Sequence, residues 1–166
     1  VDVVQLRVER AVSRRVPQPV FHLAAEHLEM VDHVHRAVRR VADAELPAPD
    51  VSVVVTVYNE AACVEELYRR TVAALEPGPR TFDLIFVDDG STDGTFAMLE
   101  RLHRADPRVR AVRFKRNFGQ HPAMHAGLSR ARGEIVVTMD GDLQNAPEDI
   151  PRLLEAVEAG NDVASG

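Results

Sequence analysis

The chain has 166 residues, of which 45% are hydrophobic and 28% charged, and its formal net charge is −6. This mixture predicts a soluble globular domain with a real core and argues against a disordered chain. The acidic balance argues against a nucleic-acid-binding protein, because no basic face offsets it. The single cysteine, Cys63, excludes an internal disulfide and a cysteine-rich zinc site, and it is compatible with a reducing cytosol.

The first fifty residues differ in pattern from the rest of the chain. Apolar residues recur at three- and four-residue steps over about 20–45, which predicts a helix there. Pro47 and Pro49 end this helix and form a short stiff linker. We therefore predict an N-terminal helical extension with a proline-containing linker over residues 1–50, followed by a separate domain over 51–166.

From residue 51 onward, short β-branched runs alternate with amphipathic segments, which predicts alternating strands and helices. The expected strands cover 51–57, 82–87, 109–114 and 134–139, with a fifth beginning at 162–164. The expected helices cover 61–75, 95–104, 122–131 and 147–159. Strands joined by helices require right-handed crossovers. The fold class is therefore α/β, with a mostly parallel sheet covered by helices on both faces.

Polar clusters follow three of the expected strands: Tyr58-Asn59-Glu60, Asp88-Asp89 and Asp140-Gly141-Asp142. In parallel sheets, ligands bind outside the carboxyl ends of the strands. Acidic groups gathered at one edge would repel one another without a cation or a donor-rich ligand. The sequence therefore predicts a ligand site at this edge.

Asp140 and Asp142 are the strongest candidates within that site. Residues two apart on an extended chain project to the same side, so both carboxylates aim at one point. Such oxygen ligands suit Mg²⁺ or Mn²⁺, which in turn holds a diphosphate. Gly141 lets a phosphate or sugar approach the backbone, and Gln144 adds a neutral donor and acceptor. The alternative is a solvated turn after a strand.

Asp89 has three interpretations. It could accept hydrogen bonds from a ribose or base, or it could belong to a β-turn followed by a helix cap. The third is a calcium loop, because five residues match the EF-hand spacing: Asp89, Ser91, Asp93, Gly94 and Glu100. That motif requires a preceding helix, whereas residues 82–87 predict a strand.

Two other features near the expected site are ambiguous on their own. Tyr58 could stack on a nucleobase, or it could be a partly buried aromatic residue beside a turn. Arg116 could pair with a phosphate or an acceptor anion, although residues 116–121 are better interpreted as a surface loop.

Four motifs occur in order along the chain, at residues 53–60, 87–95, 116–119 and 139–144. So arranged, they resemble the family 2 glycosyltransferases with the GT-A fold. Within that family the chain is similar to the branch of dolichol-phosphate mannose synthase and the bacterial undecaprenyl-phosphate sugar transferases. The resemblance covers residues 51–166, and residues 1–50 show none of it.

This resemblance implies metal-dependent, inverting transfer of a sugar from a nucleotide-diphosphate donor to a polyprenyl (undecaprenyl or dolichol) phosphate, in cell-envelope glycan biosynthesis. It implies a nucleotide pocket lined by Thr56, Tyr58, Glu60, Val87 and Asp89. It also implies catalytic roles for Asp140 and Asp142, with the metal and diphosphate held by Asp140, Gly141, Asp142 and Gln144. Thr56 departs from the family pattern, which commonly has proline there.

Family members continue with an acceptor-binding half and often with membrane-associated helices. Because the strand pattern breaks off at residues 162–166, we expect the donor half only, with a nucleotide-sugar-binding fragment lacking turnover as the alternative function. No apolar run approaches the roughly 18 residues that cross a bilayer. The expected location is cytoplasmic, at the cytoplasmic face of the membrane for a longer form.

Overall fold

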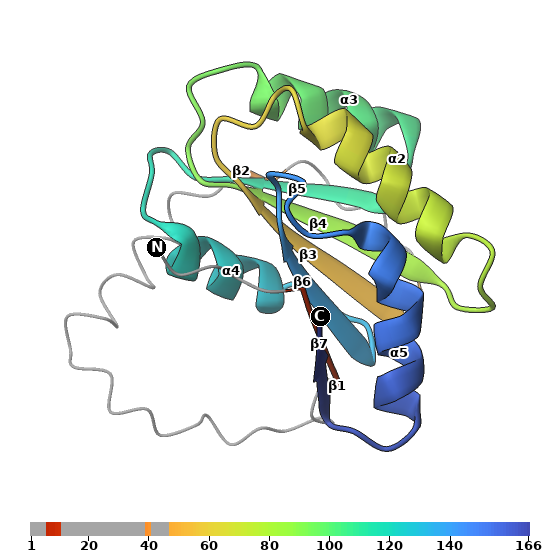
Figure 1. The fold of residues 1–166 in the computed structure, drawn as a ribbon. Coiled ribbons are helices and arrows are strands. Elements are labelled where there is room, and N and C mark those ends of the chain that lie inside the picture. Colours follow the sequence, from red (N-terminus) through yellow and green to blue (C-terminus); the bar gives the residue numbers. More distant parts are fainter. Residues whose placement is uncertain (1–5, 11–38, 41–46) are drawn as a thin grey trace, which may run out of the picture.

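The computed structural model describes residues 6–10, 39–40 and 47–166. A sheet of seven strands lies at its centre, in the order β2-β5-β4-β3-β6-β1-β7 (Figure 1). The strands are β1 (Arg7–Arg10), β2 (Arg39–Arg40), β3 (Val51–Val57), β4 (Phe82–Asp88), β5 (Val109–Arg113), β6 (Ile135–Asp140) and β7 (Val163–Ser165). The helices are α2 (Val64–Leu75), α3 (Thr95–Ala105), α4 (Gln120–Leu128) and α5 (Ile150–Glu158), with a 3-10 turn η1 (Pro147–Asp149).

The middle of the sheet is parallel, which confirms the predicted α/β fold class. β3 pairs with β4 on one side and β6 on the other, and β4 also pairs with β5. Every residue of β3 and β4 is buried. A strand that is covered on both faces favours a nearly continuous run of apolar side chains, and this explains the apolar runs in the sequence.

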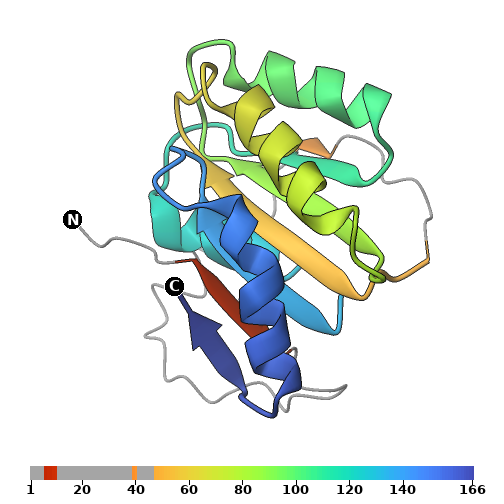
Figure 2. The same ribbon diagram turned by 45° about the vertical axis from the view of Figure 1, so that its right-hand side comes forward.

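Residues 6–10 do not belong to a helical extension, contrary to the prediction for residues 1–50. Arg7–Arg10 form β1, which lies between β6 and β7 and pairs antiparallel with both (Figure 2). Leu6 and Val8 point into the core, while Arg7 and Glu9 pair with each other at 3.1 Å. The alternation is too short to distinguish a strand by sequence alone, since the four residues of β1 span two periods.

The helix predicted over 20–45 is also wrong at the two positions where the structure describes it. Arg39–Arg40 form β2, an edge strand that pairs antiparallel with Val112 and Arg113 of β5. The remainder of that predicted helix lies outside the described residues. In the described part of the chain, no helix is long and apolar enough to cross a bilayer.

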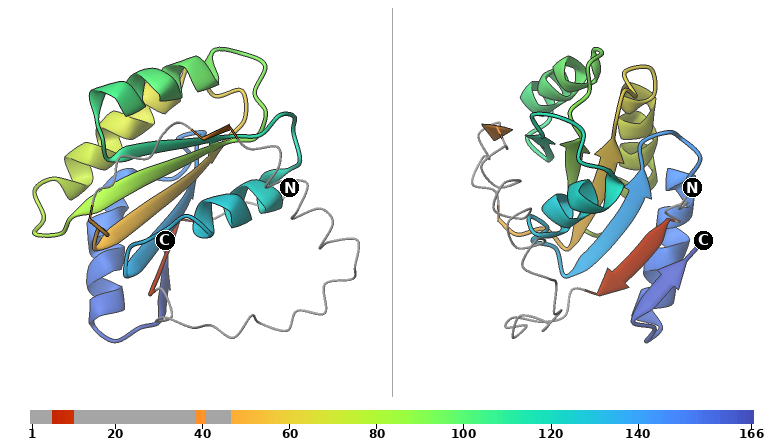
Figure 3. Two further views of the ribbon diagram at one scale, coloured as in Figure 1. Left: turned by 180° about the vertical axis from the view of Figure 1, so that it is seen from behind. Right: turned by 90° about the vertical axis from the view of Figure 1, so that its left-hand side faces the viewer.

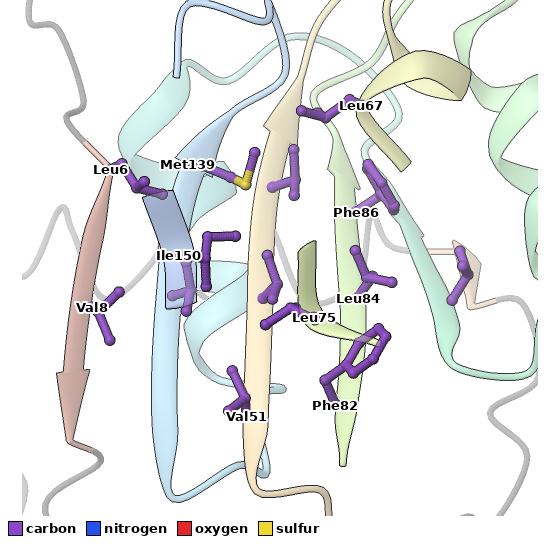
Figure 4. Close-up of a cluster of buried hydrophobic side chains, with 14 of the residues drawn as sticks. Leu6, Val8, Val51, Leu67, Leu75, Phe82, Leu84, Phe86, Met139 and Ile150 are labelled. Carbon is purple, nitrogen blue, oxygen red and sulfur yellow. The ribbon is translucent and has the colours of Figure 1, made fainter. Parts of the chain in front are cut away.

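The helices divide between the two faces of the sheet: α2, α3 and α5 cover one face, and α4 covers the other (Figures 1 and 3). Side chains alternate along each strand, so neighbouring residues enter different cores. Val53 and Val55 join the larger cluster beneath α2, α3 and α5, much of which is drawn in Figure 4. Val54 and Val87 join the smaller cluster beneath α4.

Gly127 brings α4 into close contact with the sheet. A Cβ at this position would lie 2.3 Å from Val54 Cγ1 and 3.2 Å from Val87 Cγ2. Neither valine has space to withdraw, because both are fully buried.

We expect Gly127→Ala to lower the free energy of unfolding by about 1–3 kcal/mol, the usual range for overpacking a well-filled core. Urea denaturation measures this loss. Gly94→Ala is the matched control, because its Cβ would meet Ala61 Cβ at an ordinary 3.8 Å. Equal stability of the two variants would contradict the close approach of α4.

An ion pair joins α2 to η1. Two nitrogens of the Arg70 guanidinium donate to the Glu148 carboxylate at 2.8 and 2.6 Å, and this contact lowers the pKa of Glu148 to about 2. A lowered carboxyl pKa stabilises the fold above the unfolded value of 4.5, and the contribution disappears as the pH falls from there towards 2.

We therefore expect Glu148→Gln to be slightly less stable than the parent at pH 7 and equal to it near pH 2. The effect is small because the carboxylate is 56% exposed. Thermal unfolding at both pH values measures it. Glu65→Gln is the control, since the exposed Glu65 lies 4.0 Å from Arg101. A difference that persists unchanged at pH 2 would disprove the assignment.

Candidate functional site

The carboxyl ends of β3, β4 and β6 open on one cavity of about 360 Å³. The predicted site residues that line it are Thr56, Tyr58, Glu60, Asp89, Asp140, Gly141, Asp142 and Gln144. Parallel pairing explains this convergence: Thr56 lies opposite Asp140, and Val57 lies opposite Asp88. The three strand ends are therefore level with one another.

Val87 is the predicted site residue that does not line the cavity. Its side chain is fully buried and belongs to the cluster beneath α4. A residue inside a strand points to a face of the sheet and not beyond the strand end. The structure therefore places Val87 underneath the site.

Asp140 is held by side chains from two other elements. Its Oδ1 accepts a hydrogen bond of 2.6 Å from Gln120 Nε2 and a longer one of 3.3 Å from Thr56 Oγ1. Its backbone nitrogen donates to Asn145 Oδ1 at 3.0 Å. The carboxylate is half-buried, so its position is fixed while it still lines the cavity.

Asp142 sits in a tight turn after β6. Its Oδ1 accepts a hydrogen bond from the backbone nitrogen of Gln144 at 3.0 Å, which closes the turn locally. Leu143, between them, has a φ of 64°, a left-handed conformation that disfavours residues with a Cβ. The Leu143 side chain packs against the larger core, and this packing offsets the backbone strain.

Gly141 is needed for packing. A Cβ there would lie 2.4 Å from Val57 Cγ1 and 2.9 Å from the Thr56 carbonyl oxygen. Atoms of β3 therefore occupy the space that a side chain at position 141 would need. Packing against β3, and not the approach of a phosphate or sugar that the sequence suggested, is the main reason for a glycine here. Its absent side chain lets the β6 turn lie against β3.

The donor set fits a divalent cation that is shared with a bound ligand. Asp140 and Asp142 line the same cavity, with the Gln144 side chain beside them. Mg²⁺ is commonly held by one or two carboxylates together with substrate phosphates. Among the residues that the structure describes, no three His, Cys, Asp or Glu side chains form a metal cluster.

Asp89 supports a loop. Its two carboxylate oxygens accept hydrogen bonds from the backbone nitrogens of Phe118 and Gly119, both at 2.8 Å. The side chain is almost fully buried, and this burial raises its pKa although the two N–H groups oppose the shift. Asp89 thus fixes residues 116–119 at the rim of the cavity, a role the sequence interpretations did not include.

The loops after β3 and β4 are tied together by backbone-to-side-chain bonds. Asn59 N donates to Ser91 Oγ at 2.8 Å, and Glu60 N donates to Thr95 Oγ1 at 2.9 Å. Asp93 accepts from the backbone nitrogen of Thr95 at 2.9 Å. Since β4 and not a helix precedes this segment, the EF-hand alternative lacks its defining element. Tyr58, which is 44% exposed, lines the cavity next to these hydrogen-bonded segments.

Sequence reasoning missed part of the lining, which comes from the loop after β5 and the start of α4: Asn117, Gly119, Gln120 and Ala123. The available signal was their position after the third parallel strand, at the same sheet edge. Arg116, the residue singled out there, is exposed and lies over the Phe118 ring at 4.2 Å.

A parallel α/β sheet with a carboxylate-lined cavity at its carboxyl edge places this protein among the α/β folds that bind ligands beyond the carboxyl ends of their strands. A family model of Glycosyl transferase family 2 matches residues 52–166, and the chain belongs to this family. An undecaprenyl-phosphate 4-deoxy-4-formamido-L-arabinose transferase of Edwardsiella ictaluri is 47% identical over 114 residues, which are 68% of this chain and 35% of that protein. The chain therefore spans about a third of the curated relatives it matches.

Solved structures show the same fold. TarS 1–349 of S. aureus superposes with a TM-score of 0.53 at 27% identity, covering 64% of this chain and 31% of TarS. Glucosyl-3-phosphoglycerate synthase of Mycobacterium tuberculosis, in complex with Mn²⁺, UDP-glucose and phosphoglyceric acid, gives 0.52 at 27% identity, covering 68% and 40%. These neighbours confirm the predicted GT-A fold. The Mn²⁺ in the mycobacterial complex is consistent with a divalent metal in this fold.

We expect Asp89→Ala to release the loop of residues 116–119, because two partly buried N–H groups lose a charged acceptor. Stability should fall by about 1.5–3 kcal/mol, and amide exchange at Phe118 and Gly119 should accelerate. Asp93→Ala is the control, since it removes a carboxylate that bonds Thr95 and leaves residues 118–119 untouched. Unchanged exchange at Phe118 and Gly119 in the Asp89 variant would contradict this role.

Proposed function

We propose that the cavity binds a nucleotide-diphosphate sugar, with Asp140, Asp142 and Gln144 holding Mg²⁺ or Mn²⁺ against the diphosphate. The observation that carries this proposal is the pair of half-buried carboxylates at the end of β6, both lining a cavity at the carboxyl edge of a parallel sheet. The complex of the mycobacterial neighbour with Mn²⁺ and UDP-glucose supports the same ligand class.

The other lining residues have different roles in this proposal. The exposed ring of Tyr58 offers a stacking surface for a nucleobase. Thr56 and Glu60 add polar atoms to the lining of the cavity. Asp89 acts indirectly, by holding residues 116–119 against the cavity. The donor-binding domain of this proposal covers residues 51–166, with β1 completing its sheet.

For the whole protein, we propose transfer of the sugar to a polyprenyl phosphate with inversion at the anomeric carbon. The undecaprenyl-phosphate transferases among its relatives support this acceptor class. A bound divalent cation supplies positive charge that offsets the charge on the departing diphosphate. A phosphate-monoester acceptor, with a second pKa of about 6, is largely ionised at neutral pH and attacks without a protein general base. Such an acceptor would bring the protein to the cytoplasmic face of a membrane.

Binding and turnover are measured separately, because the chain spans about a third of its relatives. We expect calorimetry to show UDP binding that requires Mn²⁺ or Mg²⁺ and disappears after chelation with EDTA. Asp142→Asn should weaken this metal-dependent binding at least tenfold, because the loss of a side chain that only orients a metal ligand already costs about 10–100-fold. Asp162→Asn, at an exposed position before β7, is the control. Equal UDP affinity with and without the cation would overturn the proposal.

A further inference from the structure

Gln120 makes a short hydrogen bond to the carboxylate of Asp140, and the sequence motifs give it no role. Its Nε2 donates to Asp140 Oδ1 at 2.6 Å. A bond of this length between an amide donor and a charged carboxylate is strong and directional. Gln120 is the first residue of α4, whereas Asp140 is the last residue of β6, so the contact joins two elements at the cavity.

Three features give Gln120 a rigid support. Gly119, immediately before it, is the N-cap of α4 and has a φ of 96°, a backbone conformation that glycine adopts readily. The backbone of Phe118 and Gly119 is held by the buried carboxylate of Asp89. The Phe118 ring meets the buried Phe114 edge-to-face, with centroids 5.5 Å apart. The amide of Gln120 is thus presented from a segment fixed by charge and by packing.

We propose that Gln120 is a positioning residue that orients the Asp140 carboxylate for a divalent cation. This inference rests on the proposed function, because it assigns the cation to Asp140. Side chains that hydrogen-bond a metal-ligating carboxylate fix its orientation, and their loss typically lowers metal affinity by 10–100-fold. Thr56 donates to the same oxygen at the longer distance of 3.3 Å, so it supports the orientation less strongly.

The geometry also connects the cation site to the loop after β5. Asp89, at the end of β4, holds residues 118–119, and Gln120 then holds Asp140 at the end of β6. The ends of β4 and β6, which β3 separates in the sheet, are therefore linked through one segment, residues 118–120. A change in this loop should reach the cation through Asp140, without any contact between the loop and the metal.

The test compares the parent chain with Gln120→Met, which keeps the side-chain length and removes the donor. Mn²⁺ affinity is measured by electron paramagnetic resonance titration in the presence of UDP, and the thermal midpoint by circular dichroism. We expect Gln120→Met to weaken Mn²⁺ binding by tenfold or more at a temperature where it is fully folded. His121→Ala, at the exposed neighbouring position on α4, should bind Mn²⁺ as the parent does. Thr56→Val should show a smaller loss than Gln120→Met.

The outcomes separate the two proposals. If the parent chain binds no Mn²⁺ with UDP, the proposed function itself fails. If the parent binds Mn²⁺ and Gln120→Met binds it equally well, the positioning role is overturned while the donor site stands. A lower thermal midpoint with unchanged Mn²⁺ affinity would show that Gln120 is structural only, which also overturns the inference.

Discussion

The register of β3 against its two parallel neighbours is the constraint on which the site depends. Pairing brings Thr56 level with Asp140 and Val57 level with Asp88, so the polar residues that follow each strand meet at one height. A shift of one residue would turn the strand's side chains to the opposite faces. Because both faces of β3 are buried, such a shift would place each core residue in the wrong cluster. Packing of the core thereby fixes the geometry of the cavity.

The acidic residues at this edge serve two different purposes. Asp88 is fully buried, accepts a hydrogen bond from Ser91 N at 2.9 Å and lies 3.4 Å from Arg113 Nε. Asp89 is stabilised by the two N–H groups of the loop after β5. The repulsion expected among clustered carboxylates is thus relieved at β4 by internal partners. The carboxylates of β6 line the cavity more openly, and there a cation shared with a diphosphate would balance their charge.

Rigidity around the cavity comes from loops that are bonded to one another as well as to the sheet. Side-chain oxygens of Ser91, in the loop after β4, and of Thr95, the first residue of α3, accept hydrogen bonds from backbone N–H groups of the loop after β3. Asp89 does the same for the loop after β5. These bonds satisfy backbone donors that a loop would otherwise leave to solvent. The cavity is therefore bordered by loops with fixed shape, which favours binding a ligand without a large ordering cost.

The sequence by itself determined the parallel α/β fold, the positions of its central strands and helices, and the sheet edge that carries the site. These follow from local patterns: β-branched runs, helical periodicity and the polar clusters after strand ends. Only the tertiary structure decided that Leu6 and Val8 belong to the core, that Val87 lies beneath the site, that Asp89 bonds residues 118 and 119, and that Gln120 bonds Asp140. Each of these depends on contacts between residues far apart in the chain, such as Gln120 with Asp140 or Arg7 with Thr138. Local periodicity carries no information on which distant partner a side chain meets, so packing and pairing had to supply it.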